Sequence, residues 1–319
     1  MSFNVSNTYG AVTIGALSAS LLSGAVAIQT ILYYKLYPSD LIRVKTLVFA
    51  IWLLDTCHTC FVWVSLWNML ISDYGSIDII PWSIGVTIVI TAVLTFLVHC
   101  FFAHRIFMLS KRNWLLTCPI LILAAFRLAS ACVTTSEMIR LKTYPAFKQD
   151  FRWVFTLGLA LSSAVDMLIT GSLFGLLHKS RSEAEKYEIP SILVPPSNSE
   201  RPSLNAVIDS LILYTFETGS LTCAATIIDM ICWITMSSNL IFMGLHFVIS
   251  KLYANSLLVT LNTRRGLRRG QWSSSGRTGS AIILDSRRPR DRVVTDPESA
   301  KRAELQINVE RSIHYSTDY

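Results

Sequence analysis

The residues best suited to chemistry in this chain are ionisable groups that lie inside long apolar stretches. At 1.5 Å of rise per helical residue, six of them fall near the middle of those stretches: Asp55, His58, Arg127, Asp166, Glu217 and His246. A charge at the centre of a bilayer costs from about 2.5 to more than 10 kcal/mol, so such groups face the interior of a helix bundle and find partners there. A layer of this kind can lock helix to helix by hydrogen bonds, form a path for a ligand, an ion or a proton, or carry out catalysis. All three roles stay open.

Arg127 is the fixed cation of this layer. A guanidinium keeps its charge at any ordinary pH, and the carboxylates of Asp55, Asp166 and Glu217 lie at a similar depth. We therefore predict an ion pair between Arg127 and at least one of them in the bundle core. The alternative is that Arg127 extends to the outer headgroups. Asp55 and His58, three residues apart, are predicted to share a helix face.

The remaining candidates do not match named chemistries. Lys251 lies toward the end of the last apolar stretch, so we expect its side chain to reach the membrane surface rather than to hold retinal. His99 and His104 are five residues apart and face different sides of a helix. The Cys-x-x-Cys formed by Cys57 and Cys60 lies within an apolar stretch, where small packing residues are the better interpretation. We predict no catalytic residue, no metal site and no cofactor, and hence no enzyme.

Seven apolar stretches, each about as long as a bilayer is thick, position these residues. They cover residues 10–34, 47–69, 82–105, 114–135, 153–177, 206–233 and 240–261. About 20 mainly apolar residues are enough for a helix to cross the ~30 Å hydrocarbon core. Only 15% of the residues are charged, against about a quarter in soluble domains. The sequence therefore predicts an all-α, polytopic membrane protein, a seven-transmembrane helix bundle.

Basic residues predict how the chain is threaded. Lys and Arg gather in alternate connections and in the tail, and basic loops mark the cytoplasmic side. We therefore predict the N-terminus outside and the C-terminus inside, in the plasma membrane rather than an endomembrane. Connection 136–152 departs from the rule, because it should lie outside yet holds Arg140, Lys142, Lys148 and Arg152. Either an anionic ligand or headgroup lies there, or the connection is an ordinary solvated loop.

Three regions follow from this threading. They are a short extracytoplasmic segment, 1–9; the transmembrane domain, 10–261, with a cytoplasmic loop at 178–205; and a disordered, basic cytoplasmic tail, 262–319. The tail begins with a basic cluster made of Arg264, Arg265, Arg268 and Arg269. Each basic residue next to a membrane gains ~1 kcal/mol from anionic lipid, so we predict lipid contact there. The predicted partners are the bilayer and a cytoplasmic protein, and no nucleic acid is expected.

Five short motifs carry a resemblance to a known family. They are Tyr37-Pro38-x-Asp40, Trp52-x-x-Asp55-x-x-His58, Phe101-Phe102-x-x-Arg105, Thr218-Gly219-x-Leu221-Thr222 and Lys251-Leu252-Tyr253-x-Asn255-Ser256-Leu257-Leu258-x-x-Leu261-Asn262-x-Arg264. Over residues 15–264 the chain resembles a large family of seven-span membrane proteins of mushroom-forming basidiomycete fungi, known only as a domain of unknown function. The resemblance implies the fold and membrane residence, and no established activity. His99 stands where many members have Gln, which argues against a metal role for it.

The last motif is the most specific, and it marks a polar set at the inner end of the final span. This inner-end motif comprises Lys251, Tyr253, Asn255, Ser256, Asn262 and Arg264. We expect Asn255 and Ser256 to hydrogen-bond a neighbouring helix, because polar side chains in apolar surroundings seek partners worth ~0.6–2 kcal/mol each. Arg264 and Arg265 are expected at the lipid headgroups.

Three functions stay open. A seven-helix sensor or receptor-like protein comes first, because the topology, the polar core, the 178–205 loop and the basic tail all suit it. A small-solute or proton-coupled transporter is the alternative. The buried carboxylates favour it, but the sequence lacks an inverted repeat and a pair of helices broken by Gly or Pro. A membrane enzyme comes third, since no catalytic motif supports it.

Overall fold

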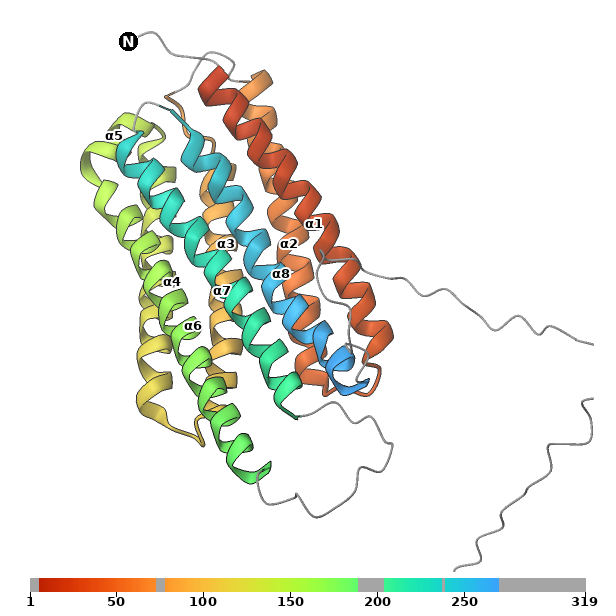
Figure 1. The fold of residues 1–319 in the computed structure, drawn as a ribbon. Helices are drawn as coiled ribbons and strands as arrows, with labels where there is room; N and C mark the ends of the chain where they lie inside the picture. The colour runs from red at the N-terminus through yellow and green to blue at the C-terminus, as the bar shows by residue number, and fades with distance from the viewer. Residues whose placement is uncertain (1–5, 73–77, 189–203, 237–238, 270–319) are drawn as a thin grey trace, which may run out of the picture. The chain divides into compact units, whose positions relative to one another are not determined.

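A computed structural model of the chain describes residues 6–72, 78–188, 204–236 and 239–269. These residues belong to one unit of the chain, Met1–Ser274, and form eight α-helices (Figure 1). The predicted tail, 262–319, lies mostly outside the described residues, and the predicted loop, 178–205, lies partly outside them.

The helices follow one another along the chain, most of them with short connections. In order they are α1 (Ala11–Leu36), α2 (Ile42–Trp67), α3 (Trp82–Leu109), α4 (Trp114–Leu141), α5 (Tyr144–Asp150), α6 (Arg152–Glu188), α7 (Leu204–Thr235) and α8 (Ile241–Arg269). A π-helical turn, Ser6–Gly10, leads into α1, and another, Asn68–Ser72, extends α2. Each predicted apolar stretch falls on one long helix. The short α5 is an additional element, in connection 136–152.

Six helices are long and apolar enough to cross a membrane, counted over the described residues. Their segments are Thr8–Leu36, Ile42–Ser72, Trp82–Leu109, Trp114–Leu141, Arg152–Ser180 and Ile241–Arg264. Helix α7 adds a shorter apolar segment, Gly219–Thr235. Even the shortest of the six, with 24 residues, is longer than the ~20 residues that span the hydrocarbon core. The chain is therefore an integral, multi-pass α-helical membrane protein.

The outer faces of the helices are apolar, and many polar side chains face inward. Leu21 is 79% exposed and Leu115 is 84% exposed, whereas Asp55, His58 and Asp166 are buried. Lipid can cover the exposed apolar faces, while the polar groups in the interior must find partners within the protein. This distribution is the reverse of that in a soluble domain.

Local sequence signals set the helix ends. Pro81 precedes α3, which begins at Trp82 as predicted. Asn113 caps α4, since its side chain accepts a hydrogen bond from the backbone N–H of Leu115 at 3.0 Å. Pro145 lies in the first turn of α5, where a missing N–H costs little.

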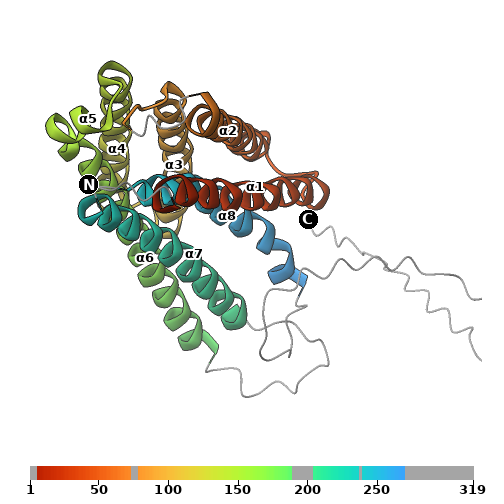
Figure 2. The ribbon, with the colours of Figure 1, turned by 90° about the horizontal axis from the view of Figure 1, so that it is seen from above.

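Helix α8 runs beside α1 and is packed against several other helices (Figures 1 and 2). It also contacts α2, α3 and α7. The backbones of helices α1 and α8 are in contact at Gly15 and Gly244, where a Cβ added to Gly15 would overlap the Gly244 backbone. Small residues at such a crossing allow two helix backbones to touch. This position makes α8 the element most able to link the others.

Two apolar clusters lie along the bundle, and polar residues lie between them. One cluster, toward the end that holds α5 (the α5 end), includes Val62 of α2. The other, toward the end of α8 marked by Arg264 (the Arg264 end), includes Ile51. Asp55 and His58 lie between these two positions on α2, and on α6 and α8 the buried polar residues lie where the two clusters meet, among apolar members of both. We call this intermediate zone the polar layer.

Candidate functional site in the polar layer

The polar layer contains three groups of residues that share α8. The lysine cluster is Ser23, Asp55, Thr59 and Lys251; the tyrosine cluster is His99, Ser162, Asp166 and Tyr253; the histidine pair is Asp229 and His246. Helix α8 supplies one residue to each group, within eight positions of its sequence. The predicted single layer of six residues is therefore divided among separate sets of neighbours.

The lysine cluster joins α1, α2 and α8. Lys251 Nζ lies 2.9 Å from Asp55 Oδ1, as an ion pair rather than an aligned hydrogen bond. It donates to the Asp55 carbonyl oxygen at 2.8 Å and to Thr59 Oγ1 at 2.7 Å. Ser23 donates to the other oxygen of the Asp55 carboxylate. The ammonium therefore has two hydrogen bonds and one ion pair, each to an oxygen inside the bundle.

The prediction that Lys251 reaches the membrane surface is therefore wrong. Its side chain is fully buried, and so is that of its partner Asp55. Three acceptors inside the bundle satisfy the ammonium, so extension toward the headgroups gains nothing further. His58 is buried on α2 as well, with Ser250 Oγ at 3.4 Å from its Nδ1. Asp55 and His58 thus both face inward, as their spacing predicts, but they contact different residues of α8.

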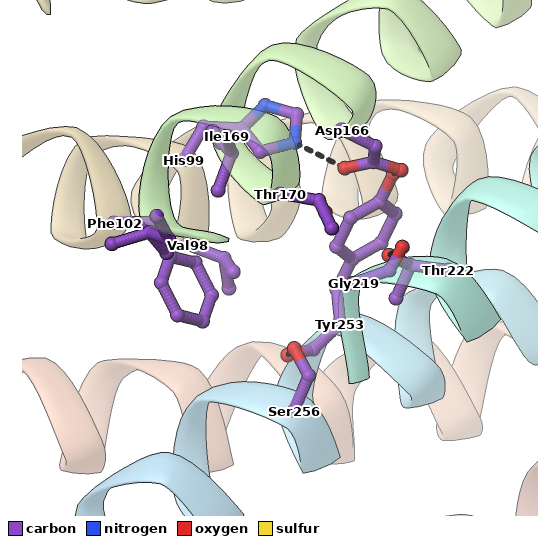
Figure 3. A pocket seen from close by; sticks show the side chains of 11 residues that line it. Val98, His99, Phe102, Asp166, Ile169, Thr170, Gly219, Thr222, Tyr253 and Ser256 are labelled. Atoms are coloured by element: carbon purple, nitrogen blue, oxygen red, sulfur yellow. Dashed lines mark hydrogen bonds and ion pairs between the residues drawn. The ribbon is translucent and has the colours of Figure 1, made fainter. Parts of the chain in front are cut away.

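The tyrosine cluster joins α3, α6 and α8 (Figure 3). His99 Nε2 lies 3.2 Å from Asp166 Oδ1, and the hydroxyl of Tyr253 donates to Asp166 Oδ2 at 2.6 Å. Ser162 Oγ lies 2.9 Å from the Tyr253 hydroxyl. The rings of His99 and Tyr253 meet edge to face, with centroids 5.5 Å apart. Both oxygens of Asp166 therefore have partners within this cluster, and Arg127 is not one of them.

A small cavity of about 20 Å³ adjoins this cluster. His99, Asp166 and Tyr253 line it, together with Gly219 and Thr222 of α7 (Figure 3). A single water needs roughly 10–15 Å³ of such space, whereas pockets for organic ligands measure about 300–1,000 Å³. The site can therefore hold water and share a proton among His, Asp and Tyr, but it does not accommodate an organic substrate.

The histidine pair joins α7 and α8. His246 Nδ1 lies 3.5 Å from Asp229 Oδ2, and both side chains are buried. The ring of Phe155 on α6 packs against His246, with centroids 5.8 Å apart. Asp229 is absent from the sequence candidates, although its position inside the apolar stretch 206–233 carries the same signal as that of Asp166.

The predicted ion pair of Arg127 is not formed. Its side chain is buried, with 7% of the residue exposed, and Nε and Nη1 have no hydrogen-bond partner among the described residues. Within the same part of the chain, no carboxylate lies within 4.0 Å of the guanidinium. Burial equally rules out the alternative that Arg127 extends to the outer headgroups.

The rotation of each helix explains this correction. Asp55 faces α8 and is paired with Lys251. Asp166 contacts His99 and accepts a hydrogen bond from Tyr253. Glu217 is exposed on α7 rather than buried in the core. Depth along a helix follows from the sequence, but the direction of a side chain around the helix depends on tertiary packing.

The inner-end motif is divided between interhelical and local contacts. Asn255 makes the predicted interhelical bonds: its amide donates to the Leu22 carbonyl at 3.2 Å, and Gln29 donates to its side-chain oxygen at 2.9 Å. Asn262 donates to the Gln29 carbonyl at 3.0 Å. The prediction for Ser256 is wrong, since it donates to the Tyr253 carbonyl of its own helix.

Arg264 was expected at the lipid headgroups, and its side chain contacts other residues of the protein. It donates to Asp40 at 2.7 Å and its guanidinium lies 4.8 Å from the ring centroid of Tyr37. The pKa of Asp40 is lowered: burial by itself raises it, but hydrogen bonds from Arg264 and Tyr33 and the charge of Arg264 outweigh burial. The side chains of Arg265, Arg268 and Arg269 lie outside the described ones, so the lipid contact predicted for them stays a prediction.

A wide groove lies at the α5 end, in the region of connection 136–152. This α5 groove measures about 960 Å³ and is lined by Lys148, Asp150, Arg152, Trp153, Leu157, Ala160 and Ile234, among others. Burial, and then the charge of Arg152, lower the pKa of Lys148. Arg152 also donates to the Ile234 carbonyl at 2.6 Å, which ties α6 to α7.

Among the described residues, no group of three or more His, Cys, Asp or Glu is placed to hold a metal ion. The seven cysteines are free thiols. Cys57 and Cys60 therefore do not form a disulfide with each other.

The fold and the buried polar layer define the class of the chain as an integral, multi-pass α-helical membrane protein. Residues 162–266 match a family model described as a family of unknown function (DUF6534). The matched region runs from α6 to α8 and includes Asp166, Asp229, His246, Lys251 and Tyr253. Comparisons with curated proteins and with solved structures found no match.

Proposed function

We propose that the protein is a seven-helix, receptor-like sensor in which α8 transmits a change from the α5 end to the Arg264 end. The observation that carries the proposal is the position of α8. Its polar side chains bind α1 through Asn255, α2 through Lys251 and α6 through Tyr253, and His246 contacts Asp229 of α7 at 3.5 Å. A shift of α8 therefore changes the partners of several helices at once, as switching elements do.

The ligand proposed for the sensor is an anionic amphiphile that binds in the α5 groove. The tyrosine-cluster cavity and the cavity beside Arg127, of about 20 and 30 Å³, are each lined by described residues and are too small for an organic ligand. In the groove, Lys148 and Arg152 supply positive charge against the single carboxylate of Asp150, while Trp153 and Leu157 extend an apolar surface along α6. An anionic head with an apolar chain matches this arrangement.

The proposed threading has seven spans, with the N-terminus outside and the C-terminus inside, and α7 as the sixth span. The support is the distribution of basic residues. It puts the α5 groove outside the cell and the Arg264 end inside, beside a cytoplasmic protein partner. Epitope tags at each terminus, probed on intact and on permeabilised cells, test this threading. A C-terminal tag that is reachable in intact cells would refute it.

Binding can be tested on the purified full chain in a neutral detergent. Oleate and lysophosphatidate should raise the melting temperature, whereas uncharged monoolein should not. Ala160→Trp fills the apolar part of the groove from an exposed position, so it should abolish the effect without unfolding the protein. Arg140→Gln is the matched control, since Arg140 is an exposed basic residue outside the groove. An equal response in Ala160→Trp and the parent would reject the groove as the site.

Sensing can be tested separately from binding by hydrogen–deuterium exchange. Bound oleate should change exchange at the Arg264 end, near Asp40, as well as around α5. A change confined to α5 and α6 would leave the groove as a lipid site and reject the sensor.

A proton-coupled transporter is the second candidate. The observation in its favour is the set of buried carboxylates, Asp55, Asp166 and Asp229, each next to a basic side chain. Proton flux into liposomes that contain the parent chain, lost in Asp166→Asn, would favour this alternative. A membrane enzyme stays third, with His99 and Asp166 as the acid–base pair it would use.

A further inference from the structure

The guanidinium of Arg127 is a buried cation, and no carboxylate of the described residues is in contact with it. Nε and Nη1 are shielded from solvent and have no hydrogen-bond partner among the described residues. Asp166 interacts with Arg127 only at longer range, and its oxygens are bonded to His99 and Tyr253. Because arginine does not lose its charge at ordinary pH, this arrangement calls for a further group beside it.

A cavity beside Arg127 provides room for such a group. It measures about 30 Å³ and lies between α3, α4, α6 and α8. A water occupies roughly 10–15 Å³ of such space, so the cavity fits one monatomic anion or about two waters. Gly158 helps to keep it open, because a Cβ there would lie 3.2 Å from Ser130 Oγ.

The lining has the chemistry of an anion site. Arg127, Thr134 and His246 contribute polar hydrogens or ring nitrogens, and both ring nitrogens of His246 are without a hydrogen bond among the described residues. None of the ten described residues that line the cavity is a carboxylate. Ser130 donates its hydroxyl proton to the Val154 carbonyl, so it takes no direct part. Asp229 contacts His246 and is outside the lining.

We propose that this cavity binds one small anion, chloride in the cell, with Arg127 as its principal ligand. Thr134 supplies a hydroxyl donor, and His246, which contacts Asp229, also lines the cavity. The anion neutralises the guanidinium at the contact of four helices, so it stabilises their packing. This site is independent of the α5 groove and of whether the protein is a sensor or a transporter.

The test is the melting temperature of the purified full chain at constant ionic strength, with chloride exchanged for gluconate. Chloride and bromide should raise the melting temperature saturably, whereas sulfate, which is too large for the cavity, should not. Arg127→Met should lose this dependence, and Arg140→Met, on the same helix but exposed, should keep it. A parent chain that melts at the same temperature in chloride and gluconate would overturn the proposal.

A second variant covers the case in which Arg127→Met does not fold. Thr134→Val conserves the side-chain shape and removes one hydrogen-bond donor, which is worth about 1 kcal/mol. We therefore expect about 5-fold weaker chloride binding with the fold intact. In crystals grown with bromide, an anomalous peak beside Arg127 would support the site directly. Unchanged chloride affinity in Thr134→Val, or no anomalous peak in this cavity in the bromide-grown crystals, would refute the anion site and favour water as the occupant.

Discussion

Lys251→Met should destabilise the protein strongly, because it removes the cation of a fully buried ion pair. The substitution keeps an unbranched side chain of similar length but leaves the Asp55 carboxylate with the hydrogen bond from Ser23 and no counter-charge. Breaking a buried pair by removing one partner costs about 3–5 kcal/mol. At ~2–4 °C per kcal/mol for a chain of this size, the expected fall in melting temperature is about 6–20 °C.

The assay is thermal unfolding of the purified chain in detergent at a fixed scan rate, followed by the monodisperse fraction on size exclusion. Asp55→Asn should cost a similar amount, because it leaves the ammonium buried with only the Thr59 hydroxyl and the backbone carbonyl as its other acceptors. The double variant should recover part of the loss, with a coupling of about 0.5–3 kcal/mol.

The exposed pair of Arg140 with Glu137 is the control, since surface ion pairs contribute only about 0–1 kcal/mol. Arg140→Met should therefore melt within a few degrees of the parent. If Lys251→Met behaved like Arg140→Met, or if the two single losses simply added in the double variant, Lys251 and Asp55 would not be paired in the core.

Three further predictions concern the contacts of α1 and the Arg264 end. Gly15→Ala should destabilise the protein by about 1–3 kcal/mol, because the added methyl group overlaps the α8 backbone. Gly24→Ala is the control: nothing lies within 4 Å of its added Cβ, so it should gain up to ~1 kcal/mol of helix propensity. Equal effects of the two substitutions in melting experiments would exclude the close contact. Asn255→Leu removes two interhelical bonds and should cost about 1–4 kcal/mol; unchanged melting would mean that the side chain faces lipid. Arg264 lowers the pKa of Asp40 from its ordinary value of 3.8. The stabilisation from this pair is therefore present above pH 3.8 and is lost as the pH falls below that value. The parent and Asp40→Asn should differ in melting temperature at about pH 6 and converge toward about pH 3. A difference that grows on acidification would contradict the pairing.

Much of the one-dimensional organisation was predictable from the sequence. Helices α3 and α4 begin at Trp82 and Trp114, where the apolar stretches begin. The burial of Asp55, Arg127 and Asp166 also followed from the cost of charge in hydrocarbon. Helix α5 was not predicted, because a seven-residue helix is too short to show as an apolar stretch.

The pairing in the polar layer could not be predicted, and the reason is geometrical. Successive residues turn by ~100° around a helix, so a small change in helix rotation exchanges one neighbour for another at the same depth. Glu217 and Asp166 were predicted at similar depths, yet one is exposed and the other is bound by His99 and Tyr253.

The sequence by itself determined that this chain crosses a membrane and where along its helices the ionisable residues lie, because bilayer thickness and hydropathy act along the chain. Only the tertiary structure decided which residues meet. It buried Lys251 against Asp55, and it left Arg127 beside a cavity instead of a carboxylate. The packing of α8 against its neighbours determines these contacts, because helix rotation and helix contact set which groups come within reach of each interior charge.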